Sequence, residues 1–552
     1  MKVFRLDFKG RQEVDWRSGV DSNELACQVN DLTSCVYEAT SFPDWWALRS
    51  SRRLAMEAWT KDLVAAHILR KLLKEDGTLE VEGASPTLPL LLSSQERTRI
   101  RFPGEYPMPV SRPWWRMVLW FLKRLRNRII LWRLPRPWTR QERFDLLIHT
   151  VILPECVTSE GKLNDMFFPG VQDCAQAGGK KVLTLGFAPR LAWSAGRWVR
   201  QGNWALFDEV FGIQEIKCVF HSLIRMKRLI ETWHDDIAGI SAVWLTTRWM
   251  DDLQQSEFFD SVAAASWVGA FCEERNVGYY LYSFERKTFE QAILKAVHDR
   301  SPSTKTCGYQ NAAVTNKHYH FWSYSGGKDV IPSRILTVGD VTTAILTGEG
   351  SYPKERIRIG GALRQRSLME RKALRRPVQN LLVLWAESRE QYEKFWKFLR
   401  QEWDESDLSR FHFRIRLHPA IPYDFPDGEL YPGRYEVDPL DDIRQSIDWA
   451  DAILYASTSL AIVAVGSGIP VVSIRLPDCF DDDCIPRDGR LLHWRVEKPG
   501  ELKKTLDVIE ALYDEDFEEL LGRSQQFGRR YFQPATPQSF LRSLELNGSK
   551  IS

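Results

Sequence analysis

Short apolar runs alternate with segments of helical periodicity through the last third of the chain. Near-continuous apolar runs of about four to eight residues are typical of strands that are covered on both faces of a sheet. Strands that alternate with helices in this way predict a parallel sheet in a Rossmann-like domain. The expected strands are 380–386, 412–417, 435–437, 451–456, 469–474 and 491–496, and the expected helices are 388–403, 441–450, 459–465 and 501–513.

The middle of the chain shows the same alternation, which predicts a second Rossmann-like domain. We place this N-terminal domain at 1–375 and the C-terminal domain at 376–530. A tail at 531–552 is expected to cross back to the N-terminal domain. The fold class is therefore α/β, with two domains facing across a cleft in which ligands bind beyond the carboxyl ends of the strands. The expected strands here are 144–153, 180–186, 277–284, 305–309, 334–338 and 356–359, and the expected helices are 59–73, 258–275 and 288–298.

The bulk composition excludes several classes of protein. The 552 residues carry a net charge of +2, which does not favour nucleic acid as a partner. The cysteines do not show the spacing of a zinc site. We see neither a signal peptide nor an apolar stretch long enough to span a bilayer, so we expect a cytoplasmic protein.

One segment departs from this balanced charge. Residues 112–140, an insertion at about 110–140 in the N-terminal domain, hold nine Arg or Lys residues and no acidic residue. Tryptophans are interleaved with these charges within 112–138, and this combination is typical of a helix at an anionic membrane surface. The alternative is a helical hairpin packed on the sheet, with a basic face in water. An RNA-binding patch lacks the motifs that would support it.

Two polar motifs follow neighbouring strands of the C-terminal domain. His418 and Pro419 come directly after one strand, with Arg416 two positions earlier, and could contact a phosphate. After a later strand, Ser457, Thr458 and Ser459 open a helix, where hydroxyl groups and free backbone N–H groups favour an anion. A structural histidine and an ordinary helix cap are the alternatives. Together, the motifs predict a diphosphate or phosphodiester site.

These motifs, followed by the turn 466–470 and an apolar strand, resemble the donor-binding half of GT-B glycosyltransferases. They are most similar to bacterial transferases of CMP-activated acidic sugars, the sialyl- and Kdo-transferases. Residues 140–530 as a whole resemble a bacterial family for surface-carbohydrate (O-antigen, lipopolysaccharide) biosynthesis. The resemblance implies a CMP-linked nucleotide-sugar donor, a glycan or lipid-linked glycan acceptor, and a peripheral position on the inner membrane face.

The same resemblance extends to short motifs of the N-terminal domain. It implies donor binding at Gly360 and Gly361, and an acceptor-side position for Gln310 and Asn311. Where the family tends to carry Gln-His, this chain has Gln310-Asn311. An asparagine can still form hydrogen bonds but does not carry a proton at neutral pH, which puts catalysis by this position in doubt.

An inverting transferase requires a base near the acceptor hydroxyl. Glu285 ends a predicted strand and is the first candidate, and Asp165, in the loop after another strand, is a weaker one. An ion pair with Arg286 or Lys287, or a helix cap, is the structural alternative for Glu285. We expect neither a metal nor another cofactor, because no Asp-x-Asp motif follows a strand, and the acidic run 481–483 is expected to be solvated.

Three classes of function remain open at this point. The first is a metal-independent glycosyltransferase that builds a surface glycan. The second is a nucleotide-sugar epimerase or a polyol-phosphate transferase on the same fold. The third is a protein without catalytic activity, to which Asn311 gives some support.

Overall fold

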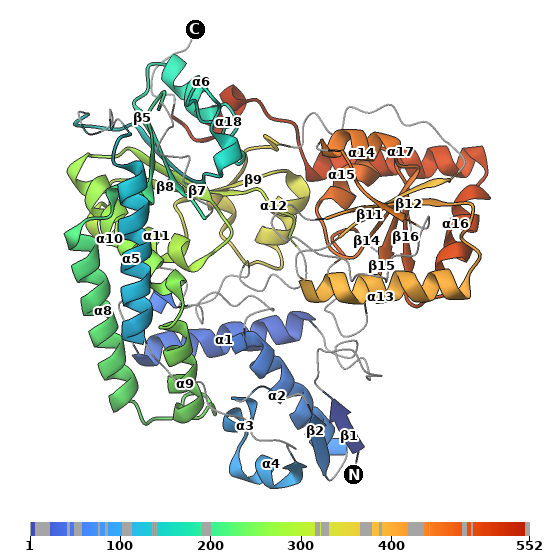
Figure 1. The fold of residues 1–552 in the computed structure, drawn as a ribbon, viewed down its shortest axis with the longest axis horizontal. Helices are drawn as coiled ribbons and strands as arrows, with labels where there is room; N and C mark the ends of the chain where they lie inside the picture. Colours follow the sequence, from blue (N-terminus) through green and yellow to red (C-terminus); the bar gives the residue numbers. More distant parts are fainter. Residues whose placement is uncertain are drawn as a thin grey trace.

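A computed structural model describes residues 2–5, 22–40, 45–48, 58–75, 78–82, 85, 87–101, 113–134, 136, 139, 141–189, 200–314, 321, 330–364, 378–385, 389–417, 435–440, 442–476, 483–486 and 490–546. Two large parallel sheets lie side by side, each with helices around it (Figure 1). The predicted fold class is confirmed: it is α/β with two Rossmann-like sheets, the arrangement of the GT-B type.

The C-terminal sheet has six parallel strands in the order β13-β12-β11-β14-β15-β16. The chain therefore builds one half of the sheet outward from β11 and then returns to start the other half at β14, as in a Rossmann fold. All six predicted strands are confirmed. They are β11 (Asn380–Leu384), β12 (His412–Arg416), β13 (Tyr435–Val437), β14 (Ala452–Tyr455), β15 (Val471–Ile474) and β16 (His493–Val496).

The N-terminal sheet has seven parallel strands in the order β10-β9-β8-β7-β4-β5-β6. Its chain reverses between β4 and β7 in the same way. The six predicted strands are confirmed, and β6 is an additional one. They are β4 (Leu146–Val151), β5 (Val182–Phe187), β6 (Trp204–Leu206), β7 (Tyr279–Ser283), β8 (Lys305–Gln310), β9 (Arg334–Thr337) and β10 (Ile357–Ile359).

Helices cover both faces of each sheet, which explains why the strands are apolar without alternation. In the C-terminal domain, α13 and α16 pack on one face, and α14, α15 and α17 pack on the other (Figure 1). In the N-terminal domain, α8, α10 and α11 cover one face, and α6 and α18 cover the other. The bounds are α6 (Val171–Ala177), α8 (Ile213–Thr232), α10 (Ser256–Glu274), α11 (Thr288–Arg300), α13 (Arg389–Glu405), α14 (Ile443–Trp449), α15 (Leu460–Gly466), α16 (Leu502–Glu510), α17 (Asp514–Tyr531) and α18 (Pro537–Ser543).

The end of the chain lies against the N-terminal domain. After α17, the backbone N–H of Gln533 donates to Val338 O, and that of Ala362 donates to Gln533 O. Helix α18 then packs on α6, with Phe540 among the rings of Phe168 and Tyr309. The last helices thus connect the two sheets.

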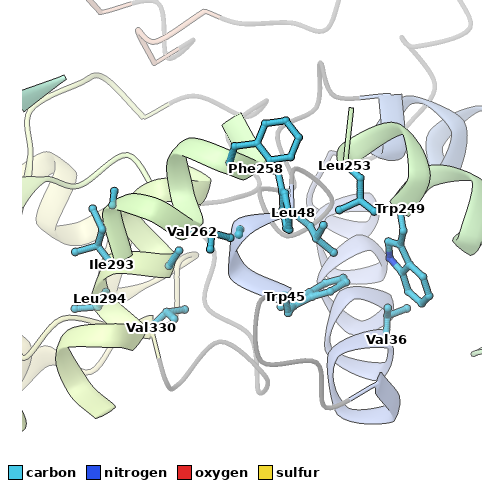
Figure 2. Close-up of a cluster of buried hydrophobic side chains, with 14 of the residues drawn as sticks. Val36, Trp45, Leu48, Trp249, Leu253, Phe258, Val262, Ile293, Leu294 and Val330 are labelled. Carbon is cyan, nitrogen blue, oxygen red and sulfur yellow. The ribbon is translucent and has the colours of Figure 1, made fainter. Parts of the chain in front are cut away.

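A third, small sheet near the N-terminus was not predicted. Its strands β1 (Lys2–Arg5), β2 (Leu79–Glu82) and β3 (Ile100–Arg101) pair in parallel, although long segments separate them in sequence. Trp45, in the short helix η1 (Trp45–Ala47), is buried in one apolar cluster with Val36 of α1 and Trp249 of α9, which ties this region to the larger domain (Figure 2). The remaining helices are α1 (Ser22–Thr40), α2 (Ala58–Glu75), α3 (Leu88–Leu91), α4 (Ser94–Arg99), α7 (Phe207–Val210), α9 (Ala242–Asp252), α12 (Asp340–Thr347), η4 (Pro154–Cys156) and η8 (Lys354–Arg356).

The basic, tryptophan-rich segment forms helix α5 (Pro113–Leu131), which confirms the predicted helical insertion. It runs alongside α8 and α10 on the outside of the N-terminal domain (Figure 1). Within the described part of the chain, no helix is both long enough and apolar enough to cross a bilayer.

Candidate active site

The N-terminal sheet places two predicted carboxylates at the same edge. Strands β4 and β7 are direct neighbours, and the chain reverses between them. Asp165 lies in the loop that follows β4, and Glu285 lies two residues after β7. The carboxyl ends of strands at such a reversal are where open parallel sheets bind ligands. The strand order therefore supports this edge as a site.

Glu285 is joined to Asn311 through Ser283. The Ser283 hydroxyl lies 3.2 Å from Glu285 Oε1 and 3.3 Å from Asn311 Oδ1, so it can donate to either. On its other oxygen, Glu285 forms an ion pair with Lys287 Nζ at 2.6 Å. The structure thus brings together two site residues that were predicted separately, and the ion pair expected as the structural alternative is also present.

The loop that presents Glu285 is held from beneath. Arg286 has a φ of 51°, a left-handed conformation that is uncommon for a residue with a side chain. Its buried guanidinium donates to the Tyr352 hydroxyl at 2.8 Å and to Gln291 Oε1 at 3.2 Å. Glu290 Oε2 accepts the backbone N–H groups of Glu285 and Lys287 at 2.9 and 3.2 Å. Strained backbone that is fixed by its surroundings is typical of functional sites.

Glu290 makes this loop sensitive to pH. Burial raises the pKa of Glu290 to about 8, from an ordinary value of 4.5. A raised pKa in the folded state means that the neutral form favours folding, so this contribution is complete below 4.5 and is lost as the pH rises towards 8. We expect Glu290→Gln, which stays neutral, to remove this loss, which amounts to at most about 1.4 kcal/mol per pH unit. Urea unfolding between about pH 5 and pH 8 measures the effect.

The matched control for this change is Glu274→Gln at the exposed end of α10. The control should keep the wild-type dependence of unfolding free energy on pH. If Glu290→Gln and the wild type lose stability in parallel over this range, Glu290 does not titrate there.

Asp165 is almost completely buried, at 8% exposure. Its Oδ1 accepts the Thr150 hydroxyl at 3.0 Å and the backbone N–H groups of Phe167 and Phe168 at 2.8 and 3.1 Å. Burial raises the pKa of Asp165, although these hydrogen bonds act in the opposite direction. Asp165 is therefore held rigidly, with one oxygen committed to the loop.

Three buried polar atoms at this edge have no hydrogen-bond partner among the residues that the structure describes. They are Asp165 Oδ2, Gln310 Oε1 and Asn311 Nδ2. Buried polar groups in native proteins are normally paired, so a group of such atoms at a strand edge calls for a ligand or bound water as partner. This observation brings Gln310 and Asn311, at the end of β8, into the same site as the carboxylates.

Arg364 is a member of this site that the sequence reasoning missed. Its guanidinium lies 5.4 Å above the ring of Phe167, and its charge interacts with Glu285 and Asp165. Its side chain is exposed. The only signal in the sequence is its position shortly after a predicted strand and the Gly-Gly turn. A cation that interacts with both carboxylates gives the site a place for an anionic group.

The structure accounts for Gly360 and Gly361 by packing. A Cβ on Gly361, whose φ is +81°, would lie 2.6 Å from Ala535 Cβ, and one on Gly360 would lie 3.0 Å from Leu336 Cβ. At Gly361 the positive φ and the close approach of Gln533 and Ala535 require glycine, whereas Gly360 packs tightly against Leu336 and Phe540. Donor binding by these two residues stays a prediction.

In the C-terminal sheet, Ser457, Thr458 and Ser459 follow β14, where the chain reverses between β11 and β14. Thr458 Oγ1 accepts the backbone N–H of Leu460 at 3.3 Å, but Ser459, the N-cap residue of α15, forms no side-chain capping hydrogen bond. Ser457 is buried. These three residues lie at the point where the strand order of this sheet reverses, as Glu285 and Asp165 do in the N-terminal sheet. Binding of phosphate by them stays a prediction.

Arg416 is engaged in the C-terminal domain itself. One of its terminal nitrogens lies 2.5 Å from Asp438 Oδ2, 2.7 Å from Leu440 O and 2.9 Å from Ser446 Oγ. These contacts tie β12 to the start of α14 and give Arg416 a structural role. His418 and Pro419 lie outside the described residues.

The expectation that the acidic run 481–483 is solvated is wrong for Asp483. Its side chain is 3% exposed, and its Oδ2 lies 3.0 Å from His493 Nε2. The Tyr455 hydroxyl donates to Oδ1 at 2.5 Å. Burial opposes ionisation, but the hydrogen bonds from His493 and Tyr455 outweigh it and lower the pKa of Asp483. The next residue, Cys484, contacts Thr458 O at 3.4 Å, so this segment lies beside the predicted donor site.

Within the part of the chain that the structure describes, no group of three or more His, Cys, Asp or Glu side chains could hold a metal ion. Independence from metals stays a prediction, because other residues can contribute ligands.

No family model matches the chain, and no curated protein matches it. Several solved structures resemble it weakly. The glycotransferase of kitacinnamycin is 12% identical, with a TM-score of 0.42, over 73% of this chain and 99% of that chain. The UDP-GlcNAc 2-epimerase from Neisseria meningitidis, bound to UDP-GlcNAc, is 13% identical, with a TM-score of 0.41, over 73% and 100%. The wall teichoic acid polymerase TagF with CDPG is 9% identical, with a TM-score of 0.38, over 78% and 96%. Likenesses of this strength identify neither a family nor a reaction.

Proposed function

We propose that this protein is a glycosyltransferase of the GT-B type, which moves a sugar from a nucleotide donor to a surface-glycan acceptor. The observation that carries the proposal is the group of buried polar atoms without a partner beside Glu285, Asp165 and Arg364. Carboxylate and amide groups of this kind recognise hydroxyl groups, and a sugar offers several on adjacent carbons. The acceptor would therefore bind at the carboxyl edge of the N-terminal sheet.

Glu285 is the proposed base for this transfer. It would take the proton of the acceptor hydroxyl while the acceptor oxygen forms a bond to the anomeric carbon of the donor sugar. The bond between that carbon and the donor phosphate oxygen breaks, and the electron pair leaves with the phosphate. Asn311 and Asp165 would orient the acceptor, and Arg364 would supply positive charge for the phosphate or for an acidic sugar.

The donor would bind in the C-terminal domain, where Ser457, Thr458 and Ser459 follow β14 at the reversal of the sheet. Hydroxyl groups at this place suit a phosphate, and the resemblance of the sequence to transferases of CMP-activated acidic sugars makes a CMP-linked donor the proposed one. His418 would contact the same phosphate. No metal and no further cofactor is part of this proposal.

A nucleotide panel read by melting temperature tests the donor site. We expect CMP to stabilise the protein more than UDP or GDP, because the proposed donor is linked to CMP. A ligand at about 100 times its dissociation constant adds roughly 2.7 kcal/mol to the free energy of unfolding. His418→Ala should abolish the shift with CMP while leaving the melting temperature of the free protein unchanged. A larger shift with UDP or GDP would replace the CMP assignment, and a protein that responds to no nucleotide contradicts the proposal.

Product analysis separates transfer from the other reactions of this fold. A transferase consumes a nucleotide sugar in proportion to the acceptor supplied. If the protein converts a free UDP-sugar to its epimer without an acceptor, it is an epimerase. Because the proposed acceptor is a lipid-linked or growing surface glycan, we place the reaction at the inner face of the cytoplasmic membrane.

A further inference from the structure

Helix α5 is fastened to the N-terminal domain by one face. On that face the Trp120 indole donates to Asp260 Oδ1 at 2.6 Å, and Arg124 forms an ion pair with Asp208 at 2.5 Å and another with Asp260. Arg128 donates to Phe211 O at 2.6 Å, which fixes the later part of the helix. These contacts with α7 and α10 set the rotation of the helix about its axis, so its outward face is defined.

That outward face is apolar. Residues at helical spacing on the side opposite Trp120 and Arg124 project from the surface: Trp115 is 58% exposed, Leu122 50% and Ile129 60%. A surface helix of a globular protein normally turns polar side chains outward, but α5 exposes large apolar side chains as well as its basic ones. The alternative of a helix packed on the domain with basic side chains in water describes the inward face and the exposed arginines, but it does not account for these exposed apolar side chains. Other exposed apolar side chains on it are Trp114, Val118, Leu119, Phe121 and Leu125, with Trp132 just after its end.

Basic side chains flank the apolar stripe. Arg116, Lys123, Arg126 and Arg128 are exposed along the helix, as is Arg133 beyond it, and residues 112–140 contain no acidic residue. Helix α8 extends the apolar surface beside α5. Its Phe220 is 41% exposed, and the centroid of the Phe220 ring lies 5.5 Å from that of Trp114. The surface is thus long and largely apolar, with exposed cations beside the apolar stripe and, at Arg126, within it, and it is bordered by indoles near both ends.

We propose that this face of α5, from Trp114 to Trp132, docks on a bilayer that contains anionic lipid. Its charge fits such a surface: the long basic side chains reach lipid phosphates, while the apolar side chains enter the boundary between headgroups and acyl chains. Indoles are favoured at that boundary because they join an apolar ring to an N–H donor. Docking rests on the proposed function in one respect: it would bring the protein to a lipid-linked acceptor. Binding to the bilayer itself can be measured without any substrate.

The test uses the full chain with vesicles of phosphatidylcholine, with or without about one-third phosphatidylglycerol. We expect co-sedimentation with the anionic vesicles and weak binding to the neutral ones. The double variant Leu122→Gln/Ile129→Gln should lower the partition coefficient roughly 100-fold, because it removes two central apolar side chains. The triple variant Arg116→Gln/Lys123→Gln/Arg126→Gln should lower binding to anionic vesicles roughly 10–100-fold and weaken its dependence on salt.

The matched control is Val508→Gln/Tyr513→Gln, which changes two exposed apolar residues of the C-terminal domain, at 53% and 80% exposure. It should bind vesicles as the wild type does, and all variants should melt at the wild-type temperature. Nucleotide-induced shifts in melting temperature should persist in the α5 variants, which separates docking from the proposed transfer. Failure of the wild type to bind anionic vesicles overturns the proposal. Binding of the Leu122→Gln/Ile129→Gln variant to vesicles as strongly as the wild type also overturns it. A wild-type dimer in gel filtration that becomes monomeric in this variant would show that the face is a protein interface, and it overturns the proposal as well.

Discussion

Glu285→Gln is expected to lower the rate of sugar transfer by about 10²–10⁴-fold, the usual contribution of a general base. The amide keeps the size of the side chain and can still accept the Ser283 hydroxyl, but it cannot take a proton. Its ion pair with Lys287, at 2.6 Å, is lost as well. The measurement is the initial rate with the donor that the nucleotide panel identifies, at saturating acceptor. Donor affinity should change little, because the donor is proposed to bind on the other sheet.

Lys287→Met is the control that separates the two roles of Glu285. It breaks the same ion pair but leaves the carboxylate in place. If Glu285 is the base, Lys287→Met should retain most of the activity that Glu285→Gln loses. Equal losses in the two variants would show that Glu285 acts only through its ion pair, and the assignment of the base would then pass to Asp165.

Arg124→Met is expected to cause the largest loss of stability, about 3–5 kcal/mol. The substitution leaves Asp208 and Asp260 facing each other without the guanidinium that bridges them, and the Asp208 side chain is only 1% exposed. A buried charge that loses its partner keeps its desolvation penalty. Thermal unfolding should show a decrease in melting temperature on the order of 10 °C.

Two further variants establish the cause of this loss of stability. Arg126→Met changes an exposed arginine two positions along the same helix and should melt within about 2 °C of the wild type. Adding Asp208→Asn and Asp260→Asn to Arg124→Met should recover much of the stability, because no uncompensated charge remains. If the triple variant is no more stable than Arg124→Met alone, lost packing rather than charge explains the effect.

The candidate site was only partly predictable from the sequence. Glu285 and Asp165 could be placed after strands because the apolar runs that precede them clearly indicate buried strands. Arg364 could not, since its nearness to both carboxylates depends on how the chain leaves β10 and on the ring of Phe167. Asp483 was misjudged for the same reason, because an acidic run looks solvated until the fold places His493 and Tyr455 against one of its members.

The sequence by itself determined the strands of both large sheets except β6, several of the helices between them, and the unusual composition of 112–140. These properties depend on neighbours a few positions apart, so periodicity and charge reveal them directly. The sequence did not reveal the long helices α8 and α17. Tertiary structure alone decided the strand order, which reverses the chain beside Glu285 and Ser457, and the pairing of β1, β2 and β3 across long separations. It also decided the rotation of α5. Apolar and basic residues occur all around that helix, and only the ion pairs of Arg124 with Asp208 and Asp260 decide which of the apolar residues lie on the outside.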